Sequence, residues 1–337
     1  MNTPALLTRR TALAGTLAFL GAPLRAQNAT WESVIQAAGA LEQLHSLTIY
    51  QDGAPVVEEV FRGPPIGQPV PIKSVSKTIV AALTGAALET GEVPSLSATL
   101  GSLAPQLIPT GADPQVANIT IANLITMQAG LERTSGANYG AWVSSANWVA
   151  DALSRPFVAS PGERMLYSTG SFHVLGAVLS EVSGKSLLSL ARERLGGPLG
   201  IVVPAWTRDP QGRYLGGNEM ALTRDGMIRF GEMYRNDGLF AGEQVLSAEW
   251  VEGSFKPRTR SPFPGLDYGY GWFLGDSDGV RFALARGYGG QLICVVPEPA
   301  LTIAITSDPT RPARSAGYFG NLMTLINQHI LPAARSI

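Results

Sequence analysis

Ser74 and Lys77 form an S-x-x-K pattern at the start of a long apolar, helix-forming run. A helix places residues i and i+3 on one face, so we expect the Ser74 hydroxyl and the Lys77 amine to be neighbours in its first turn. The following residues, 78–88, are apolar almost all round, which predicts a core helix. Burial and the helix dipole would both lower the pKa of Lys77, favouring a neutral amine that can accept the serine proton.

The same tetrapeptide also has a purely structural interpretation. Ser74 could be a helix N-cap, and Lys77 could be a surface lysine whose stem covers apolar residues. A lysine in the first turn opposes the helix dipole, so helix stability alone does not explain its presence. The pattern by itself leaves both interpretations open.

Length and composition predict a globular protein with a sizeable core. The chain has 337 residues, of which 45% are hydrophobic and 15% are charged. The formal net charge is −1 and the lysines are scattered, so no basic patch for nucleic acid is predicted and a small molecule is the expected partner. His45, His173 and His329 lack metal-ligand spacing, and Cys294 lies in a predicted buried strand. We therefore predict neither a metal nor another cofactor.

The amino terminus has the pattern of a twin-arginine export signal. Arg9 and Arg10 precede a short apolar run over residues 12–20, and cleavage would fall near Ala26. The run is well short of the ~20 residues that a membrane span needs. We therefore expect residues 1–26 to direct export to the periplasm, with no membrane span in the mature chain. The large Leu24 leaves an uncleaved tether open.

Two blocks of predicted strands enclose a mainly helical middle. The predicted elements outside this middle are a helix over 31–43, a hairpin over 47–62, an antiparallel meander and a helix over 316–330. The meander has predicted strands over 268–274, 280–285, 291–296 and 301–306. We expect residues 27–72 plus 262–337 to form an α/β domain and residues 73–261 to form a mainly helical second domain. The predicted fold class is therefore α/β (α+β), an antiparallel sheet flanked by helices.

Four ordered motifs carry a family resemblance. They are S-x-x-K at 74–77, L-I-T-M-Q-A-G-L at 124–131, Tyr167-Ser-Thr169 and the stretch 216–231. Their order and approximate spacing resemble the penicillin-recognising serine hydrolase superfamily, in particular its class C β-lactamase-like esterases and amidases. The resemblance covers most of the mature chain and implies a β-lactamase/transpeptidase-like fold.

The resemblance implies roles for the matched residues. Ser74 would be the nucleophile, and Lys77, coupled to Tyr167, would accept its proton. The backbone N–H groups of Ser74 and Tyr288 would bind the oxyanion. Thr169, Gly287 and Gly289 fall at substrate-binding positions, although the glycines also fit a plain hairpin turn.

The third family motif differs in this chain. Where K-T-G or H-T-G is usual, the sequence has Ala285-Arg286-Gly287 followed by Tyr288-Gly289-Gly290-Gln291, and Thr169 replaces the asparagine of Y-x-N. Both groups that would hold a β-lactam are missing, which disfavours its hydrolysis. The G-Y-G-G-Q pattern instead resembles aminohexanoate-oligomer hydrolases and related esterases. We therefore expect cleavage of ester or linear amide bonds.

Other interpretations stay open. A β-lactamase or a D-amino-acid peptidase acting on peptidoglycan-type amides would suit an exported protein, and a non-catalytic binding or sensor protein could keep the same fold. Gly275–Gly279 matches G-x-S-x-G, but a strand is predicted after Ser277 where a nucleophile elbow needs a helix. The aromatic residues Tyr139, Trp142 and Trp148 could line a substrate pocket or belong to the core.

Overall fold

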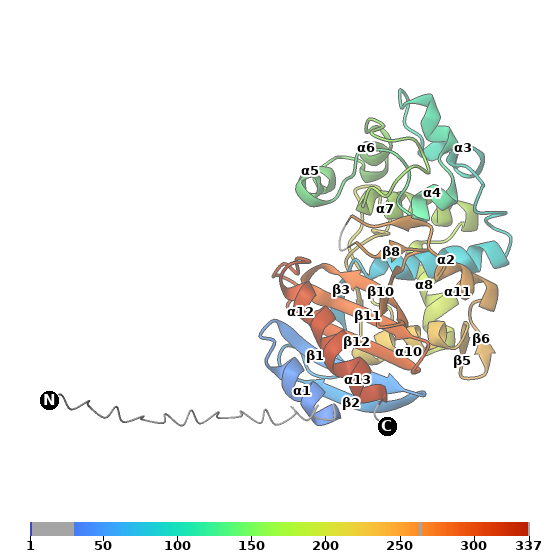
Figure 1. Ribbon diagram of the computed structural model, residues 1–337. Helices are drawn as coiled ribbons and strands as arrows, with labels where there is room; N and C mark the ends of the chain where they lie inside the picture. Colours follow the sequence, from blue (N-terminus) through green and yellow to red (C-terminus); the bar gives the residue numbers. More distant parts are fainter. Residues whose placement is uncertain (2–29, 263–264, 336–337) are drawn as a thin grey trace.

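The computed structural model describes Met1, residues 30–262 and residues 265–335 (Figure 1). The predicted export signal, apart from Met1, lies outside the described residues. The fold is of the predicted class, with a large antiparallel sheet flanked by helices and a further layer of helices beside it (Figure 1).

An eight-stranded antiparallel sheet forms the centre of the α/β part. Its strand order is β2-β1-β12-β11-β10-β9-β8-β7. The strands are β1 (Leu44–Gln51), β2 (Ala54–Val60), β7 (Thr259–Arg260), β8 (Asp267–Tyr268), β9 (Phe273–Ser277), β10 (Val280–Gly287), β11 (Gln291–Val296) and β12 (Leu301–Ser307). The predicted hairpin and meander are confirmed. They join because β1 pairs with β12, where Ile49 lies opposite Ile303.

One predicted strand is divided in the structure. The sequence pattern predicted a single strand over 268–274, whereas β8 ends at Tyr268 and β9 begins at Phe273. Gly271 between them has a φ of 81°, and its carbonyl accepts a hydrogen bond from Thr78 Oγ1 at 2.7 Å. The chain leaves the sheet here because glycine permits this conformation and the buried helix α2 (Ser76–Glu89) supplies a partner.

Helices cover both faces of the sheet. Helix α1 (Trp31–Gly39) and the C-terminal helices α12 (Tyr318–Thr324), η6 (Leu325–Ile330) and α13 (Leu331–Arg335) lie over one face (Figure 1). Helix α10 (Arg224–Arg235) packs on the other, where Thr302 of β12 bonds to the Glu232 carboxylate. Gly231 allows this close packing, because a Cβ there would lie 2.5 Å from Thr302 Cγ2.

The two predicted terminal helices differ from the structure in their boundaries. The first ends at Gly39 rather than Gln43, whose side chain is buried and donates to the Gly289 carbonyl oxygen at 3.0 Å. The last begins at Tyr318 rather than Ala316 and continues to Arg335. A π-helical turn over Leu325–Ile330 interrupts it, which the apolar spacing does not reveal.

The middle of the chain is mainly helical, as predicted. The remaining α-helices are α3 (Leu100–Leu103), α4 (Ile121–Ile125), α5 (Tyr139–Val143), α6 (Trp148–Leu153), α7 (Thr169–Ser183), α8 (Leu187–Ala191), α9 (Gly197–Leu199) and α11 (Ala248–Ser254). Two small sheets pair β3 (Val70–Lys73) with β4 (Met220–Leu222), and β5 (Leu239–Phe240) with β6 (Glu243–Gln244). Helix α2 is buried from Ser76 to Ala87, which confirms the predicted core helix. The division into two domains at residues 73 and 261 stays a prediction.

No single helix among the described residues is long and apolar enough to cross a membrane. The segments Thr169–Ser183 and Leu187–Leu199 reach that length and hydropathy only together, across a bend of 85°.

Candidate active site

The candidate nucleophile lies at the junction of a short strand and the buried helix. Lys73, the last residue of β3, has a left-handed φ of 51°, and this turn separates the strand from α2. The helix begins at Ser76 rather than at Ser74, but Val75 already has helical dihedral angles. The Lys77 N–H donates to the Ser74 carbonyl oxygen at 3.0 Å. Ser74 and Lys77 therefore keep the one-sided arrangement that their spacing predicts.

Three hydrogen bonds fix the Lys77 amine. Its Nζ lies 3.0 Å from Ser74 Oγ, 3.2 Å from Thr169 Oγ1 and 2.7 Å from the carbonyl oxygen of Gly217. A carbonyl oxygen can only accept, so one Lys77 N–H points to Gly217. A neutral amine that donates its second N–H to Thr169 keeps its lone pair for the Ser74 hydroxyl. This arrangement suits proton transfer from Ser74 to Lys77.

The surroundings of Lys77 favour its neutral form. The residue is only 2% exposed. Burial lowers the pKa of Lys77, and the neighbouring Tyr167 raises it by a smaller amount. The Tyr167 ring lies beside the amine, with 5.0 Å between Nζ and the ring centroid. The three residues that the sequence predicted as catalytic are therefore brought together.

Two residues that the sequence analysis missed hold Thr169 in place. Ser135 Oγ accepts from the Thr169 N–H at 2.8 Å and lies 2.9 Å from Thr169 Oγ1. Thr134 Oγ1 accepts from the Gly170 N–H at 2.7 Å. The first N–H groups of a helix have no partner within it, so these hydroxyls serve as remote caps for α7. Thr169 is 3% exposed and contacts Lys77 directly.

The third motif lies against the nucleophile segment. A Cβ added to Gly287 would lie 2.3 Å from the Ile72 carbonyl oxygen and 3.2 Å from Lys73 Cβ, so the end of β10 touches the residues just before Ser74. Two backbone N–H groups can serve one oxyanion only if their segments meet in this way. The Tyr288 side chain is 51% exposed and points out of the core. Oxyanion binding by Ser74 and Tyr288 stays a prediction with supporting geometry.

Gly287 provides a test of this contact. In Gly287→Ala the new methyl group would meet the Ile72 carbonyl, and backbone cannot yield as a side chain can. We expect β10 to shift and hydrolysis to fall by about 10²-fold or more, the usual loss when one oxyanion donor is removed. A steady-state assay with a chromogenic ester checks this. Gly253→Ala in α11 is the matched control, because its Cβ would have ordinary contact at 3.7 Å, and equal activity in both variants would contradict the expectation.

The next two glycines have a different reason to be glycine. Gly289 has a φ of 82°, and a Cβ there would lie 2.4 Å from the Asp308 carbonyl oxygen. Gly290 has a φ of 94° and packs against the Tyr318 ring in the same way. Contacts within the protein therefore account for both residues, and substrate binding by Gly289 stays a prediction.

Arg286 does not occupy the position of the missing lysine or histidine. Neighbouring strand residues point to opposite faces of a sheet, so Arg286 faces away from the side on which Gly287 meets Ile72. Its guanidinium lies 3.6 Å from the centroid of the Phe319 ring in α12 and donates to the Ala313 carbonyl at 2.9 Å. The charge thus stabilises the packing of the C-terminal helix.

The three aromatic residues in and beside the loop 132–147 have different surroundings. Trp142 and Trp148 are 0% and 6% exposed and pack with Leu215 in a small cluster, so they belong to the core. Tyr139 is half-buried, and its hydroxyl accepts from Asn218 Nδ2 at 3.0 Å. Asn218 follows the carbonyl that holds Lys77, so Tyr139 is the aromatic residue of the three that lies toward the candidate site.

The competing motifs occupy structural positions. Ser277 ends β9, and a turn over residues 278–279 leads directly into β10, so the sharp strand-to-helix elbow of a G-x-S-x-G nucleophile is missing there. The Gly279 N–H donates to Asp276 Oδ1 at 2.9 Å, which closes this turn. Cys294 is fully buried in β11, and burial raises the pKa of its thiol. Neither side chain lies among the residues around Lys77.

Comparisons with known proteins agree with this geometry. The family model described as beta-lactamase matches residues 36–320. A search of curated proteins finds no match.

Solved structures share the fold at low identity. One is a Bacillus anthracis protein described as a 6-aminohexanoate-dimer hydrolase, with a TM-score of 0.72 and 18% identity over 87% of this chain and 79% of that chain. Another is EstCE1, a hydrolase with promiscuous acyltransferase activity, with a TM-score of 0.71 and 16% identity over 90% and 97% of the two chains. A third is a penicillin-binding protein homologue from Caulobacter crescentus, with a TM-score of 0.70 and 14% identity over 91% and 97%.

Proposed function

Because the chain belongs to the beta-lactamase family, we propose that it is a serine hydrolase that cleaves ester or linear amide bonds through an acyl-enzyme on Ser74. The observation that carries the proposal is the set of three contacts at Lys77 Nζ. When the amine is neutral, Gly217 and Thr169 can take its two N–H groups, and its lone pair is then available to the Ser74 hydroxyl. A catalytically silent protein would have no need of a buried lysine with a lowered pKa beside a serine.

The first half of the proposed reaction forms the acyl-enzyme. Ser74 Oγ attacks the substrate carbonyl carbon while its proton passes to Lys77 Nζ. The carbonyl oxygen becomes an oxyanion, which the backbone N–H groups of Ser74 and Tyr288 stabilise. The tetrahedral intermediate then collapses. The bond to the leaving group breaks, and that group takes a proton by way of Tyr167.

The second half releases the acid. A water molecule gives a proton to the Lys77–Tyr167 pair and attacks the acyl carbon, and the Ser74 ester bond breaks as Ser74 Oγ regains a proton. The centroid of the Tyr167 ring lies 5.0 Å from Lys77 Nζ, so the two residues are treated together as the route of the proton.

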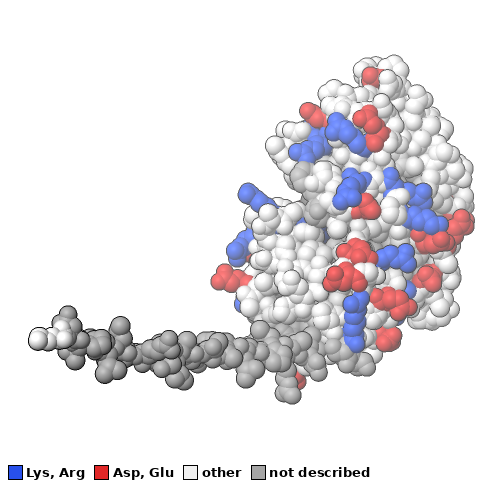
Figure 2. All heavy atoms as spheres, viewed as in Figure 1, with Lys and Arg blue, Asp and Glu red and all other residues white. Residues whose placement is uncertain are grey.

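Two features favour an uncharged or weakly charged small substrate. The lysine or histidine that would hold a substrate carboxylate is replaced by Ala285, and Arg286 is engaged with Phe319 and Ala313. Acidic and basic side chains are interspersed over the face seen in Figure 2, which also fits a small molecule better than a polyanion. The neighbour described as a 6-aminohexanoate-dimer hydrolase is named for a linear amide, which supports the amide part of the proposal.

A substrate panel tests the proposal. We expect turnover of short-chain esters and linear amides by the wild-type protein, little turnover of a penicillin, and none of either by Ser74→Ala. A long-lived penicillin adduct or fast penicillin turnover would favour the peptidase or β-lactamase alternative. Lack of reaction with every substrate and with a fluorophosphonate probe would favour a binding protein.

We further propose export to the periplasm, on the basis of the twin-arginine pattern at Arg9 and Arg10.

A further inference from the structure

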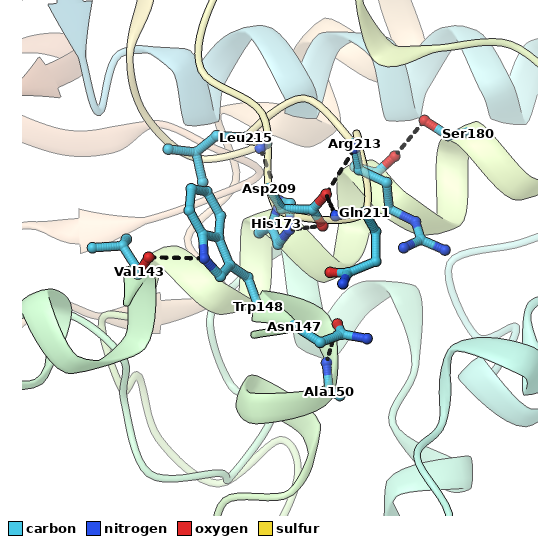
Figure 3. A network of polar contacts seen from close by, with 12 residues as sticks. Val143, Asn147, Trp148, Ala150, His173, Ser180, Asp209, Gln211, Arg213 and Leu215 are labelled. Carbon is cyan, nitrogen blue, oxygen red and sulfur yellow. Dashed lines mark hydrogen bonds and ion pairs between the residues drawn. The ribbon is translucent and has the colours of Figure 1, made fainter. Parts of the chain in front are cut away.

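A buried histidine and aspartate lie behind the candidate site. His173 belongs to α7 and Asp209 to the loop that precedes β4, and both side chains are 0% exposed (Figure 3). The imidazole is enclosed by two indole rings, with centroid distances of 5.8 Å to Trp142 and 5.6 Å to Trp148. A buried polar pair needs all its hydrogen bonds satisfied. The hydrogen-bond partners of the two side chains therefore identify the segments that the pair holds together.

The two ring nitrogens of His173 have distinct partners. Nδ1 accepts from the backbone N–H of Gly216 at 3.4 Å, and Nε2 lies 3.1 Å from Asp209 Oδ2. A backbone N–H can only donate, so the proton of a neutral ring is on Nε2 and is donated to Asp209. The other oxygen of that carboxylate accepts from the N–H groups of Gln211 and Arg213 at 3.0 and 2.7 Å. The pair thus joins α7 to the segment that leads to Gly216 and Gly217.

The residue after Gly216 contacts the candidate base. The Gly217 carbonyl oxygen accepts from Lys77 Nζ at 2.7 Å, the shortest of the three contacts of this amine. The Gly216–Gly217 segment lies directly on the start of α7, where a Cβ on Gly216 would be 2.2 Å from the Phe172 carbonyl oxygen. The side chain that accepts the Gly216 N–H is His173.

We infer that the His173–Asp209 pair positions the Gly217 carbonyl and thereby directs the lone pair of Lys77 toward Ser74. His173 and Asp209 are positioning residues in this inference, because neither touches the reacting atoms. The inference rests on the proposed function of Ser74 and Lys77. If Gly217 moved, Lys77 could turn its lone pair away from the serine, and the acylation step would slow while substrate binding stayed nearly the same.

Two substitutions separate the two hydrogen bonds of His173. In His173→Asn the amide oxygen can take the place of Nδ1 and accept from Gly216, whereas in His173→Gln the amide nitrogen can reach the place of Nε2 and donate to Asp209. We expect His173→Gln to lower kcat by about 10- to 100-fold with little change in KM, the size of effect that a small misplacement of a catalytic group produces. His173→Asn should retain more of the activity, and the acid limb of the pH profile should shift only in the Gln variant.

Glu232→Gln is the matched control for loss of a buried polar contact. Glu232 is 6% exposed, and its carboxylate bonds to Arg235 and to Thr302 of β12. We expect this variant to have a lower Tm but wild-type kcat and an unchanged pH profile. Asp209→Asn keeps the shape of the carboxylate and serves as the second probe if His173→Gln does not fold. Asp209→Asn should lower kcat, as His173→Gln does.

The results that overturn the inference are specific. Wild-type kcat in folded His173→Gln or Asp209→Asn would refute it, as would equal losses in His173→Asn and His173→Gln that follow the Tm. Wild-type hydrolysis by Ser74→Ala would instead remove the proposed function and this inference with it. An inactive Ser74→Ala beside fully active His173 variants would refute the inference alone.

Discussion

Replacing Ser74 with alanine should lower hydrolysis by roughly 10⁴- to 10⁶-fold, the range expected when a serine nucleophile is removed. The substitution deletes one oxygen from a half-buried turn, and Lys77 keeps its contacts with Thr169 and Gly217. The fold should therefore be retained. Steady-state turnover of a chromogenic short-chain ester measures the loss, and mass spectrometry after incubation with a fluorophosphonate should show an adduct on the wild type only.

Ser277→Ala is the control for Ser74→Ala. Ser277 lies in the only other serine motif that matched a hydrolase pattern in the sequence, and it ends a strand that turns directly into β10. We expect this variant to hydrolyse the ester and bind the probe as the wild type does. If Ser277→Ala were inactive and Ser74→Ala active, the assignment of the nucleophile would be wrong.

Replacing Lys77 with methionine should lower kcat/KM by about 10²- to 10⁴-fold, the usual contribution of a general base. In the wild type kcat/KM should fall as the pH drops below the lowered pKa of Lys77, because only the neutral amine can accept the Ser74 proton. The methionine variant lacks this group, so its residual activity should not show that acid limb. A pH profile of kcat/KM for both proteins measures the difference, and an unchanged limb in Lys77→Met would assign the titration to another residue.

The same substitution should change how stability depends on pH. The unfolded chain binds a proton on Lys77 up to its ordinary pKa of 10.5, whereas the folded chain has released it at lower pH because burial lowers the pKa. Between these two values the free energy of unfolding of the wild type rises with pH relative to Lys77→Met. The rise is about 1.4 kcal/mol for each unit of pKa difference. Urea unfolding from pH 7 to 10.5 measures it, and a difference independent of pH would contradict a lowered pKa.

The sequence predicted the parts of the site that are close together in the chain. Ser74 and Lys77 share one helical turn, so their spacing alone placed them side by side, and the apolar residues after them predicted the burial of α2. Tyr167 could be added only through the family resemblance. Its contact with Lys77 joins segments 90 residues apart, and no local periodicity encodes such a contact.

The parts that the sequence did not reveal depend on backbone groups and on distant loops. Every residue has a backbone carbonyl, so the contact of the Gly217 carbonyl oxygen with Lys77 cannot be predicted from the type of residue at that position. The spacing of the histidines gives no sign of the His173–Asp209 pair, because Asp209 follows 36 residues later and the two meet only after α7 and its loop have packed. Strand and helix ends also shifted where tertiary contacts intervened, as at Gly271 against Thr78.

In Tyr288 the group proposed to act in the reaction is the backbone N–H, whereas the side chain is exposed. In the proposed reaction only its backbone N–H takes part, and any residue except proline supplies that group. Because Tyr288 is 51% exposed, we expect substitution of its side chain to leave the proposed chemistry in place. Substrate preference could thus diverge at this position by single substitutions, which makes residue 288 a natural first site for directed evolution of selectivity.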